Sequence, residues 1–269
     1  MQKTIKYKDS LISFSDAGSG KAIVFLHGYL ESSEIWNDFA RKFTLNNRVV
    51  CIDLPGHGNS SISKNTASLE LMAEIVNEVL KYLCIEKCFM IGHSMGGYAT
   101  LAFLEFFPKK LFAFCLFHSH PYCDSYEVIK KRLREITLVE KGRKDSIAAI
   151  SIPNSFANIN RNSFADSIEK AISIACNTSE NGIIACLNGM IERKDRSELL
   201  EKTSVPNIII AGKLDNYISY NKVIKNMNLS ENSQLTILSN SGHMGFIEEA
   251  KLSGEILQKF IKHISNEKF

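Results

Sequence analysis

The sequence lacks the features that assign many proteins to a broad class. It contains no run of about 18 apolar residues, so we expect no transmembrane helix. The first 18 residues hold no apolar core of the length that a secretory signal needs. There is no H-E-x-x-H motif, and no G-x-G-x-x-G follows the first long apolar run. We therefore expect neither a bound metal nor a dinucleotide cofactor.

An excess of charge of one sign is also absent. The 32 Lys and Arg residues nearly balance 29 Asp and Glu, which leaves a formal net charge of +3 over 269 residues. The basic stretch "KKRLRE" at 130–135 is short and typical of a solvated helix face. The charges therefore indicate no nucleic-acid partner, and a small molecule is the expected ligand. No feature of the sequence indicates an oligomeric state.

A regular cysteine framework is missing as well. The seven cysteines are irregularly spaced, and Cys84 and Cys88 have no second pair at metal-ligand spacing. Free thiols that pack as small hydrophobic side chains fit this pattern. Together with the missing signal, they predict a cytoplasmic protein.

What the chain does contain is a series of short apolar runs separated by helical patterns. Runs of about five residues that are apolar on both faces are typical of buried parallel strands. The alternation predicts an α/β fold, with a mostly parallel sheet and helices on both faces. The first segment, 4–18, resembles an edge hairpin. The expected strands lie within 21–28, 47–58, 87–94, 111–120, 205–212 and 233–243, and the clearest helices within 68–83, 96–107 and 250–264.

One long segment interrupts this alternation. Residues 125–202 contain no convincing strand and are helical in composition. A connection of this length is far longer than an ordinary link between a helix and a strand. We therefore expect a helical cap at 125–202, inserted into a sheet domain made of 1–124 and 203–269. Insertions of this kind usually lie over the ligand-binding end of the strands.

The segment "GHSMG" gives the first indication of chemistry. Gly92, Ser94 and Gly96 form a G-x-S-x-G motif between a predicted strand and a predicted helix, which is the context of a nucleophile elbow. The sharp turn lifts the central side chain clear of the sheet, and glycines on both sides avoid collisions with neighbouring elements. Ser94 is therefore the predicted nucleophile.

A serine hydroxyl needs a base, and the base needs an orienting acid. Of the seven histidines, His243 lies between Gly242 and Gly245 on a loop after the last predicted strand, where an imidazole can reach over the sheet. Asp215 follows the strand before it and is the preferred acid, because Ser94, Asp215 and His243 occur in the chain order of one known triad arrangement. Asp124 also follows a strand and is the alternative acid.

Two backbone amides are expected to stabilise the oxyanion of an acyl-transfer reaction. One belongs to Met95, the residue after the nucleophile. The other belongs to Tyr29, because Gly28 before it lets the loop turn inward without a side-chain clash. Such donors usually make the largest electrostatic contribution to catalysis of this kind.

These motifs together resemble the α/β-hydrolase superfamily over nearly the whole chain. The matching pieces are "FLHGY", "DLPGHGNS", "GHSMGG", "AGKLDNYIS" and "SGHMGFIEE", in that order. The sequence is similar to small bacterial esterase-like serine hydrolases with a helical lid. The resemblance implies an eight-stranded sheet, a cap between strands 6 and 7, and a Ser-His-Asp triad. Ser94 at the nucleophile position disfavours the haloalkane dehalogenases and most epoxide hydrolases of this fold, which use Asp.

The expected function is hydrolysis of a small or medium carboxylic ester or thioester through an acyl-enzyme on Ser94. A lactonase or a C–C bond hydrolase on the same triad is the alternative, as is a triad-bearing ligand receptor with little turnover. Arg193 is expected either to receive a substrate carboxylate or to pair with Asp195 or another nearby acid. The candidate substrate contacts are Tyr29, Tyr122, Met190, Arg193 and Phe246.

Overall fold

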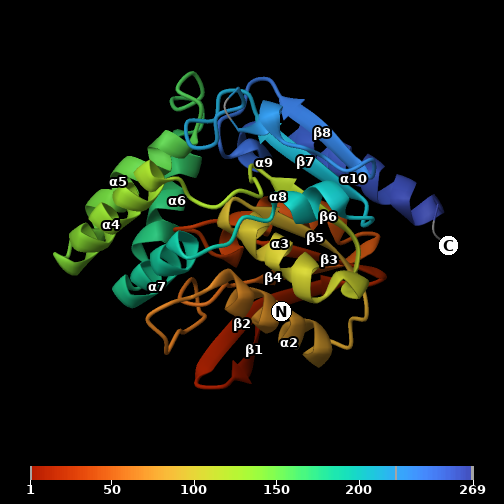
Figure 1. Ribbon diagram of the computed structural model, residues 1–269, viewed down its shortest axis with the longest axis horizontal. Coiled ribbons are helices and arrows are strands. Elements are labelled where there is room, and N and C mark those ends of the chain that lie inside the picture. The colour runs from red at the N-terminus through yellow and green to blue at the C-terminus, as the bar shows by residue number, and fades with distance from the viewer. Residues whose placement is uncertain (1, 222, 268–269) are drawn as a thin grey trace.

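A central eight-stranded sheet organises the chain in a computed structural model that describes residues 2–221 and 223–267 (Figure 1). The strand order across the sheet is β1-β2-β4-β3-β5-β6-β7-β8. The strands are β1 Gln2–Tyr7, β2 Ser10–Gly18, β3 Lys21–Leu26, β4 Asn47–Ile52, β5 Cys88–His93, β6 Leu111–Phe117, β7 Asn207–Gly212 and β8 Ser233–Leu238. Each of the six predicted apolar runs contains one of these strands.

The sheet is parallel except at one edge. β1 and β2 form an antiparallel hairpin, and β2 also runs antiparallel to β4. From β4 to β8 all neighbouring strands are parallel. The predicted edge hairpin and mostly parallel sheet are therefore confirmed. β3 lies between β4 and β5, so successive strands are added on opposite sides of β3 and the strand order reverses there. In open α/β sheets, ligands bind at such topological switch points.

Helices cover both faces of the sheet. Successive side chains of a strand point to opposite faces of the sheet, so a buried strand needs helices on both faces. On β5, Phe89 packs against Phe260 on one face, whereas Gly92 faces the helix layer on the other. α2 and α3 pack together on the Gly92 face, and α10 lies on the other. These helices and the smaller core ones are η1 Ser33–Trp36, α1 Asn37–Ala40, η2 Arg41–Phe43, α2 Leu69–Tyr82, α3 Met95–Phe106, η3 Pro108–Lys110, η4 Ile224–Asn226, α9 Gly245–Glu248 and α10 Ala250–Glu267.

Local sequence sets the ends of the two helices beside the elbow. Ser68 caps α2, since its side chain accepts a hydrogen bond from the Leu71 amide. α3 ends at Phe106, and Pro108 starts a separate 3-10 turn. The helices predicted within 68–83 and 96–107 are therefore confirmed to within a residue or two.

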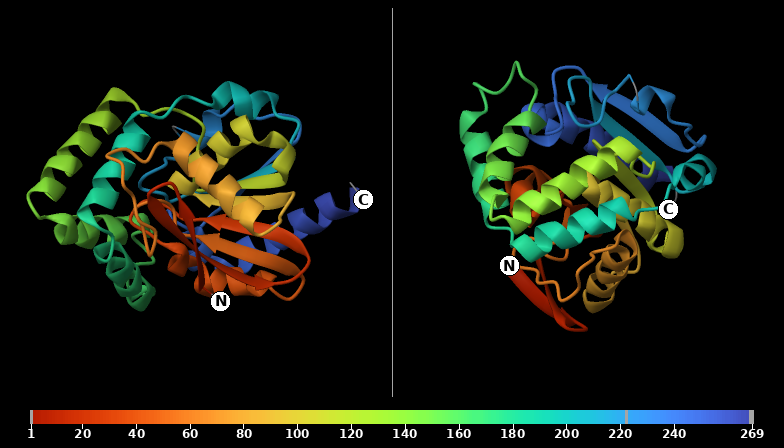
Figure 2. Two further views of the ribbon diagram at one scale, coloured as in Figure 1. Left: turned by 90° about the horizontal axis from the view of Figure 1, so that it is seen from below. Right: turned by 60° about the vertical axis from the view of Figure 1, so that its left-hand side comes forward.

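Five helices connect β6 to β7. They are α4 Tyr126–Glu140, α5 Lys144–Ser155, α6 Ala165–Cys176, α7 Glu180–Ile191 and α8 Ser197–Lys202. In Figures 1 and 2, α4 to α7 gather beside one end of the sheet, whereas α8 lies back next to α3. No helix within the described residues is long and apolar enough to cross a membrane.

The contact between α7 and the core depends on two glycines. A Cβ atom on Gly182 of α7 would overlap the carbonyl oxygen of Gly56 in the loop after β4. We predict that Gly182→Ala lowers the free energy of unfolding by about 1–3 kcal/mol, because the added methyl group forces α7 away from this loop. Gly254→Ala is the matched control, since the nearest atom to its Cβ is at 3.8 Å, and it should not destabilise the protein. Denaturant unfolding measures both, and equal stability of the two variants would contradict the close packing.

Candidate active site

Ser94 occupies a strained turn between β5 and α3. Its φ of 49° and ψ of −113° lie outside the usual regions for a residue with a side chain. A Cβ atom on Gly96 would overlap the carbonyl oxygen of Leu26, and it would lie 2.7 Å from that of His27. The start of α3 therefore rests directly on the end of β3. This close approach is possible only with glycine, and it leaves the Ser94 side chain half-buried at the switch point.

His243 and Asp215 come together on the loops after β8 and β7. His243 Nδ1 lies 2.7 Å from Asp215 Oδ2, and the other carboxylate oxygen accepts hydrogen bonds from the amides of Tyr217 and Ile218. Burial raises the pKa of Asp215, but the neighbouring imidazoles outweigh burial and hold that pKa well below its ordinary value. Burial lowers the pKa of His243, but the Asp215 carboxylate more than offsets it, so the His243 pKa is raised above 6.5.

The histidine loop lies beside the nucleophile elbow, since His93 Nε2 is 2.8 Å from the carbonyl oxygen of His243. The ring of His93, the residue before Ser94, lies 4.8 Å from the ring of His243. In the described part of the chain, neither Ser94 Oγ nor His243 Nε2 has a hydrogen-bond partner. Catalytic hydrogen bonds are often long without substrate and shorten in the reacting complex. The structure thus pairs two of the predicted residues, His243 and Asp215, and places their loop beside the elbow that carries Ser94.

The two predicted oxyanion donors are available. Within residues 2–221 and 223–267, the amides of Tyr29 and Met95 donate to no acceptor. The preceding residue, Gly28, donates its amide to Glu31 Oε2 at 2.6 Å. Two free amides from the ends of β3 and β5 therefore lie on either side of the topological switch point.

The alternative acid, Asp124, pairs with two arginines instead of a histidine. Its carboxylate binds Arg132 Nε and Arg193 Nη1, each at 2.6 Å, and makes no hydrogen bond to a histidine among the described residues. Arg193 also donates to the carbonyl of Tyr122 and stacks its guanidinium 4.0 Å over the ring of Tyr98. Arg193 was expected to bind a substrate carboxylate or to pair with Asp195 or another nearby acid. It pairs with a nearby acid, and that acid is Asp124.

The remaining candidate substrate contacts lie in different environments. Tyr29 is half-buried and donates its hydroxyl to Glu135 of α4, and Tyr122 donates to the carbonyl of Asn226. Met190 is buried within α7. Phe246 is buried too, with its ring 4.3 Å from Trp36 and 5.0 Å from His93. Phe246 therefore lies in the aromatic core beneath the histidine loop.

A second histidine touches the catalytic acid. His118 Nδ1 lies 3.5 Å from Asp215 Oδ2, and burial lowers the pKa of His118 to about 4. Ligand atoms of His118, Asp215 and His243 lie within 4.8 Å of one another, so these side chains are close enough to hold a metal ion. The amides of Gly212 and Gly245 lie 3.0 Å and 3.1 Å from His118 Nδ1 and Nε2, and a neutral imidazole accepts a hydrogen bond at only one nitrogen. Asp215 is bonded to His243. The atoms are thus occupied by hydrogen bonds that a metal ion would have to displace.

Two acids that position the loops were not predicted from the sequence. Glu31 lies in the loop after β3, and Glu248 accepts hydrogen bonds from the amides of Gly242 and Met244 on either side of His243. Neither belongs to a spaced motif, and their partners are backbone amides that only the folded chain brings together.

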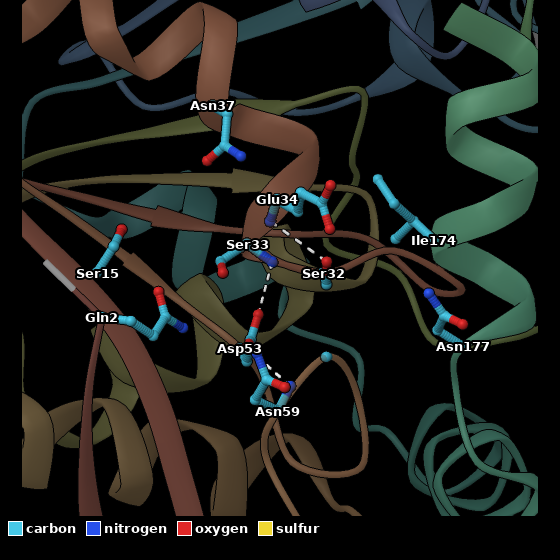
Figure 3. A pocket seen from close by; sticks show the side chains of 11 residues that line it. Gln2, Ser15, Ser32, Ser33, Glu34, Asn37, Asp53, Asn59, Ile174 and Asn177 are labelled. Carbon is cyan, nitrogen blue, oxygen red and sulfur yellow. Dashed lines mark hydrogen bonds between the residues drawn. The ribbon is translucent and has the colours of Figure 1, made fainter.

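A polar pocket of about 380 Å³ lies apart from the serine (Figure 3). Asp53 is buried beside it and uses its two carboxylate oxygens to bind the amides of Ser33 and Asn59. Asp53 therefore organises loops, and none of the three predicted triad residues lines this pocket. The lining residues are Gln2, Ser15, Ser32, Ser33, Glu34, Asn37, Asp53, Gly58, Asn59, Ile174 and Asn177.

Comparisons with known proteins agree with this architecture. A family model described as "alpha/beta hydrolase fold" matches residues 21–137. A Bacillus subtilis protein named putative 2-succinyl-6-hydroxy-2,4-cyclohexadiene-1-carboxylate synthase is 26% identical over 258 residues, which cover 91% of this chain and 92% of the relative.

Two solved structures are similar over almost the whole chain. An esterase from Thermogutta terrifontis superposes with a TM-score of 0.92 at 23% identity, covering 98% of this chain and 99% of its own. An enol-lactonase from Burkholderia xenovorans LB400 superposes with a TM-score of 0.89 at 17% identity, covering 97% of this chain and 100% of its own. At these identities the likeness shows the shared fold.

The two candidate acids can be separated by one pair of variants. We predict that Asp124→Asn lowers the free energy of unfolding by about 3–5 kcal/mol, because it leaves two buried guanidinium groups without their carboxylate. The same variant should leave the pKa of His243 unchanged, as followed by NMR titration of its ring. Asp215→Asn should lower that pKa. A fall in the His243 pKa in Asp124→Asn alone would identify Asp124 as the orienting acid.

Proposed function

Because the chain belongs to the α/β-hydrolase superfamily, we propose that it is a serine hydrolase that cleaves a small or medium carboxylic ester or thioester through an acyl-enzyme on Ser94. The observation that carries the proposal is the 2.7 Å contact between His243 Nδ1 and Asp215 Oδ2 beside a strained serine. The contact fixes the imidazole with Nδ1–H toward the carboxylate, which leaves Nε2 free to accept a proton.

The proposed reaction has two half-reactions. Ser94 Oγ attacks the acyl carbon while its proton passes to His243 Nε2, and the amides of Tyr29 and Met95 donate to the oxygen that becomes negative. Collapse of this intermediate expels the alcohol or thiol, which takes the proton from His243. Water then attacks the acyl-enzyme with His243 as base, which releases the carboxylic acid and restores the Ser94 hydroxyl. Asp215 stays ionised and stabilises the imidazolium in both steps.

The helices α4 to α7 are proposed to act as a cap that selects the acyl or alcohol group. Two contacts support this role, because the Tyr29 hydroxyl binds Glu135 of α4 and the His243 amide binds the carbonyl of Ser155 at the end of α5. Cap and catalytic loops thus share hydrogen bonds. Arg193 would meet a substrate carboxylate only by giving up part of its bonding to Asp124, so a neutral acyl ester is the preferred substrate.

The nucleophile can be tested without knowing the substrate. A fluorophosphonate probe should label wild-type protein once, at Ser94, and should not label Ser94→Ala, as read by intact mass and peptide mapping. The reason is that only a serine activated by a neighbouring base attacks phosphorus at a useful rate. Ser119 is an internal control that should stay unlabelled, because its hydroxyl donates to the carbonyl oxygen of Ser94 and makes no hydrogen bond to a histidine among the described residues.

A substrate panel then separates the hydrolase from its alternatives. Short p-nitrophenyl esters should be turned over repeatedly by wild-type protein. Turnover of a lactone or a vinylogous diketone in preference to every ester would favour the lactonase or the C–C hydrolase. A single trapped adduct without turnover would favour a receptor, and no adduct on folded protein would contradict the proposed nucleophile.

The rate should depend on pH through His243. The base acts only when neutral, and its pKa is raised by the carboxylates that face it, chiefly Asp215 and also Glu31 and Glu248. We predict that kcat/KM falls as pH falls through a value above 6.5. Asp215→Asn should move this limb to lower pH and reduce kcat by about 10⁴-fold, as the equivalent change does in another Ser-His-Asp enzyme. An unmoved limb would show that Asp215 does not face the base in solution.

A further inference from the structure

Two side chains link three loops around Ser94. Glu31 Oε2 accepts the amide of Gly28 at 2.6 Å and lies 3.0 Å from His93 Nδ1. His93 Nε2 in turn lies 2.8 Å from the carbonyl oxygen of His243. The path runs from the oxyanion loop (residues 28–31) through the nucleophile elbow to the histidine loop (residues 242–245). It connects residues that are 62 and 150 positions apart in the chain.

The hydrogen-bond partners define the polarity of this link. A carbonyl oxygen only accepts, so His93 Nε2 donates to the carbonyl oxygen of His243. One oxygen of the Glu31 carboxyl, Oε2, contacts both the Gly28 amide and His93 Nδ1. Burial raises the pKa of Glu31, but His93 and the Gly28 amide outweigh burial and lower that pKa. Glu31 and His93 therefore form a buried hydrogen-bonded pair.

The pair is sealed from water. Glu31 is 4% exposed and His93 is fully buried. The rings of Phe246 and Trp36 lie 5.0 Å and 6.2 Å from the His93 ring. Loss of one partner would leave the other as a buried polar group without its hydrogen bond, which is costlier than replacing both by apolar side chains of similar shape.

Other anchors hold one loop each. Leu30 donates its amide to His57 Nε2 at 3.3 Å, which fixes the oxyanion loop alone. Glu248 holds the amides of Gly242 and Met244, which fixes the histidine loop alone. Neither anchor reaches the other loop. In the described part of the chain, Glu31 and His93 carry the hydrogen-bonded path between the two.

We propose that the hydrogen-bonded Glu31–His93 pair is a positioning device that sets the distance between the oxyanion amides and the general base across Ser94. The inference rests on the proposed serine hydrolase function. Tyr29, whose amide is the expected oxyanion donor, directly follows the Gly28 amide that Glu31 holds. His93 holds the backbone of His243 itself. A misplacement of about 1 Å in such groups can cost about 100-fold in rate. The pair therefore acts on kcat indirectly, through the position of the Tyr29 amide and of His243.

Three variants test the device against a merely structural role. Glu31→Gln should lower the melting temperature and should lower kcat for a p-nitrophenyl ester about 10- to 100-fold, with KM within about threefold of wild type. The double variant Glu31→Leu/His93→Phe removes both polar groups and keeps the volume approximately, so it should regain most of the melting temperature. It should not regain kcat, because the link between the loops is still missing.

Asp16→Asn is the matched control. Asp16 is a poorly exposed carboxylate on β2 that binds Arg48 at 2.9 Å and Lys3 at 2.8 Å, remote from the serine in the fold. It should lower the melting temperature while kcat stays at the wild-type value. If the double variant recovers kcat together with stability, or if Asp16→Asn loses kcat as much as Glu31→Gln does, the positioning role is overturned.

Amide hydrogen exchange separates this inference from the proposed function. Glu31→Gln and the double variant should raise exchange in residues 28–31 and 242–245 together, whereas Asp16→Asn should raise it in neither loop. If wild-type protein takes no fluorophosphonate and turns over no ester, the proposed function fails. Exchange that rises in both loops still supports the link in that case, and unchanged exchange in either loop overturns it.

Discussion

The close approach of α3 to the end of β3 is the constraint on which the rest of the site depends. Gly96 packs its backbone against the carbonyl groups of Leu26 and His27, where no side chain fits. Gly92 faces α3 in the same way, so the turn between them is tight and Ser94 takes a strained conformation. β3 and β5 pair side by side in the sheet, so the loops that carry the amides of Tyr29 and Met95 leave neighbouring strand ends. The proposed nucleophile and oxyanion donors therefore depend on the same packing of α3 on the sheet.

The surroundings of a carboxylate, more than its place in the chain, decide its chemical role. Asp215 and Asp124 both follow strands of the parallel sheet. Asp215 meets an imidazole and two backbone amides, so it is suited to orient a base. Asp124 meets two guanidinium groups and joins α4 to the segment that follows α7. Glu31 is a third case, because its imidazole partner does not face the substrate and serves to hold backbone.

Most of the fold could be predicted from sequence because its signals are local. Apolar runs marked six strands. The N-cap residue Ser68 marked the start of one helix and Pro108 the end of another, each to within a residue or two. The elbow was also predictable, since Gly92, Ser94 and Gly96 impose its geometry within five residues. The roles of Phe246 and Arg193 were not, because they depend on Trp36, His93 and Asp124, which are distant in sequence. The link through Glu31 could not be predicted either, because its partner His93 is 62 positions away in the sequence.

The inserted helices meet both halves of the catalytic machinery. The Tyr29 hydroxyl, one residue from Gly28, binds Glu135 at 2.8 Å, and burial raises the pKa of Glu135. On the other side, the His243 amide binds the carbonyl of Ser155 at 2.6 Å. A shift of α4 or α5 would therefore pull on the oxyanion loop or the histidine loop. Beneath the serine, Glu31 and His93 tie these same loops together, so the geometry around Ser94 is held from both sides. A movement of α4 or α5 would therefore act on the two loops that the buried Glu31–His93 pair links.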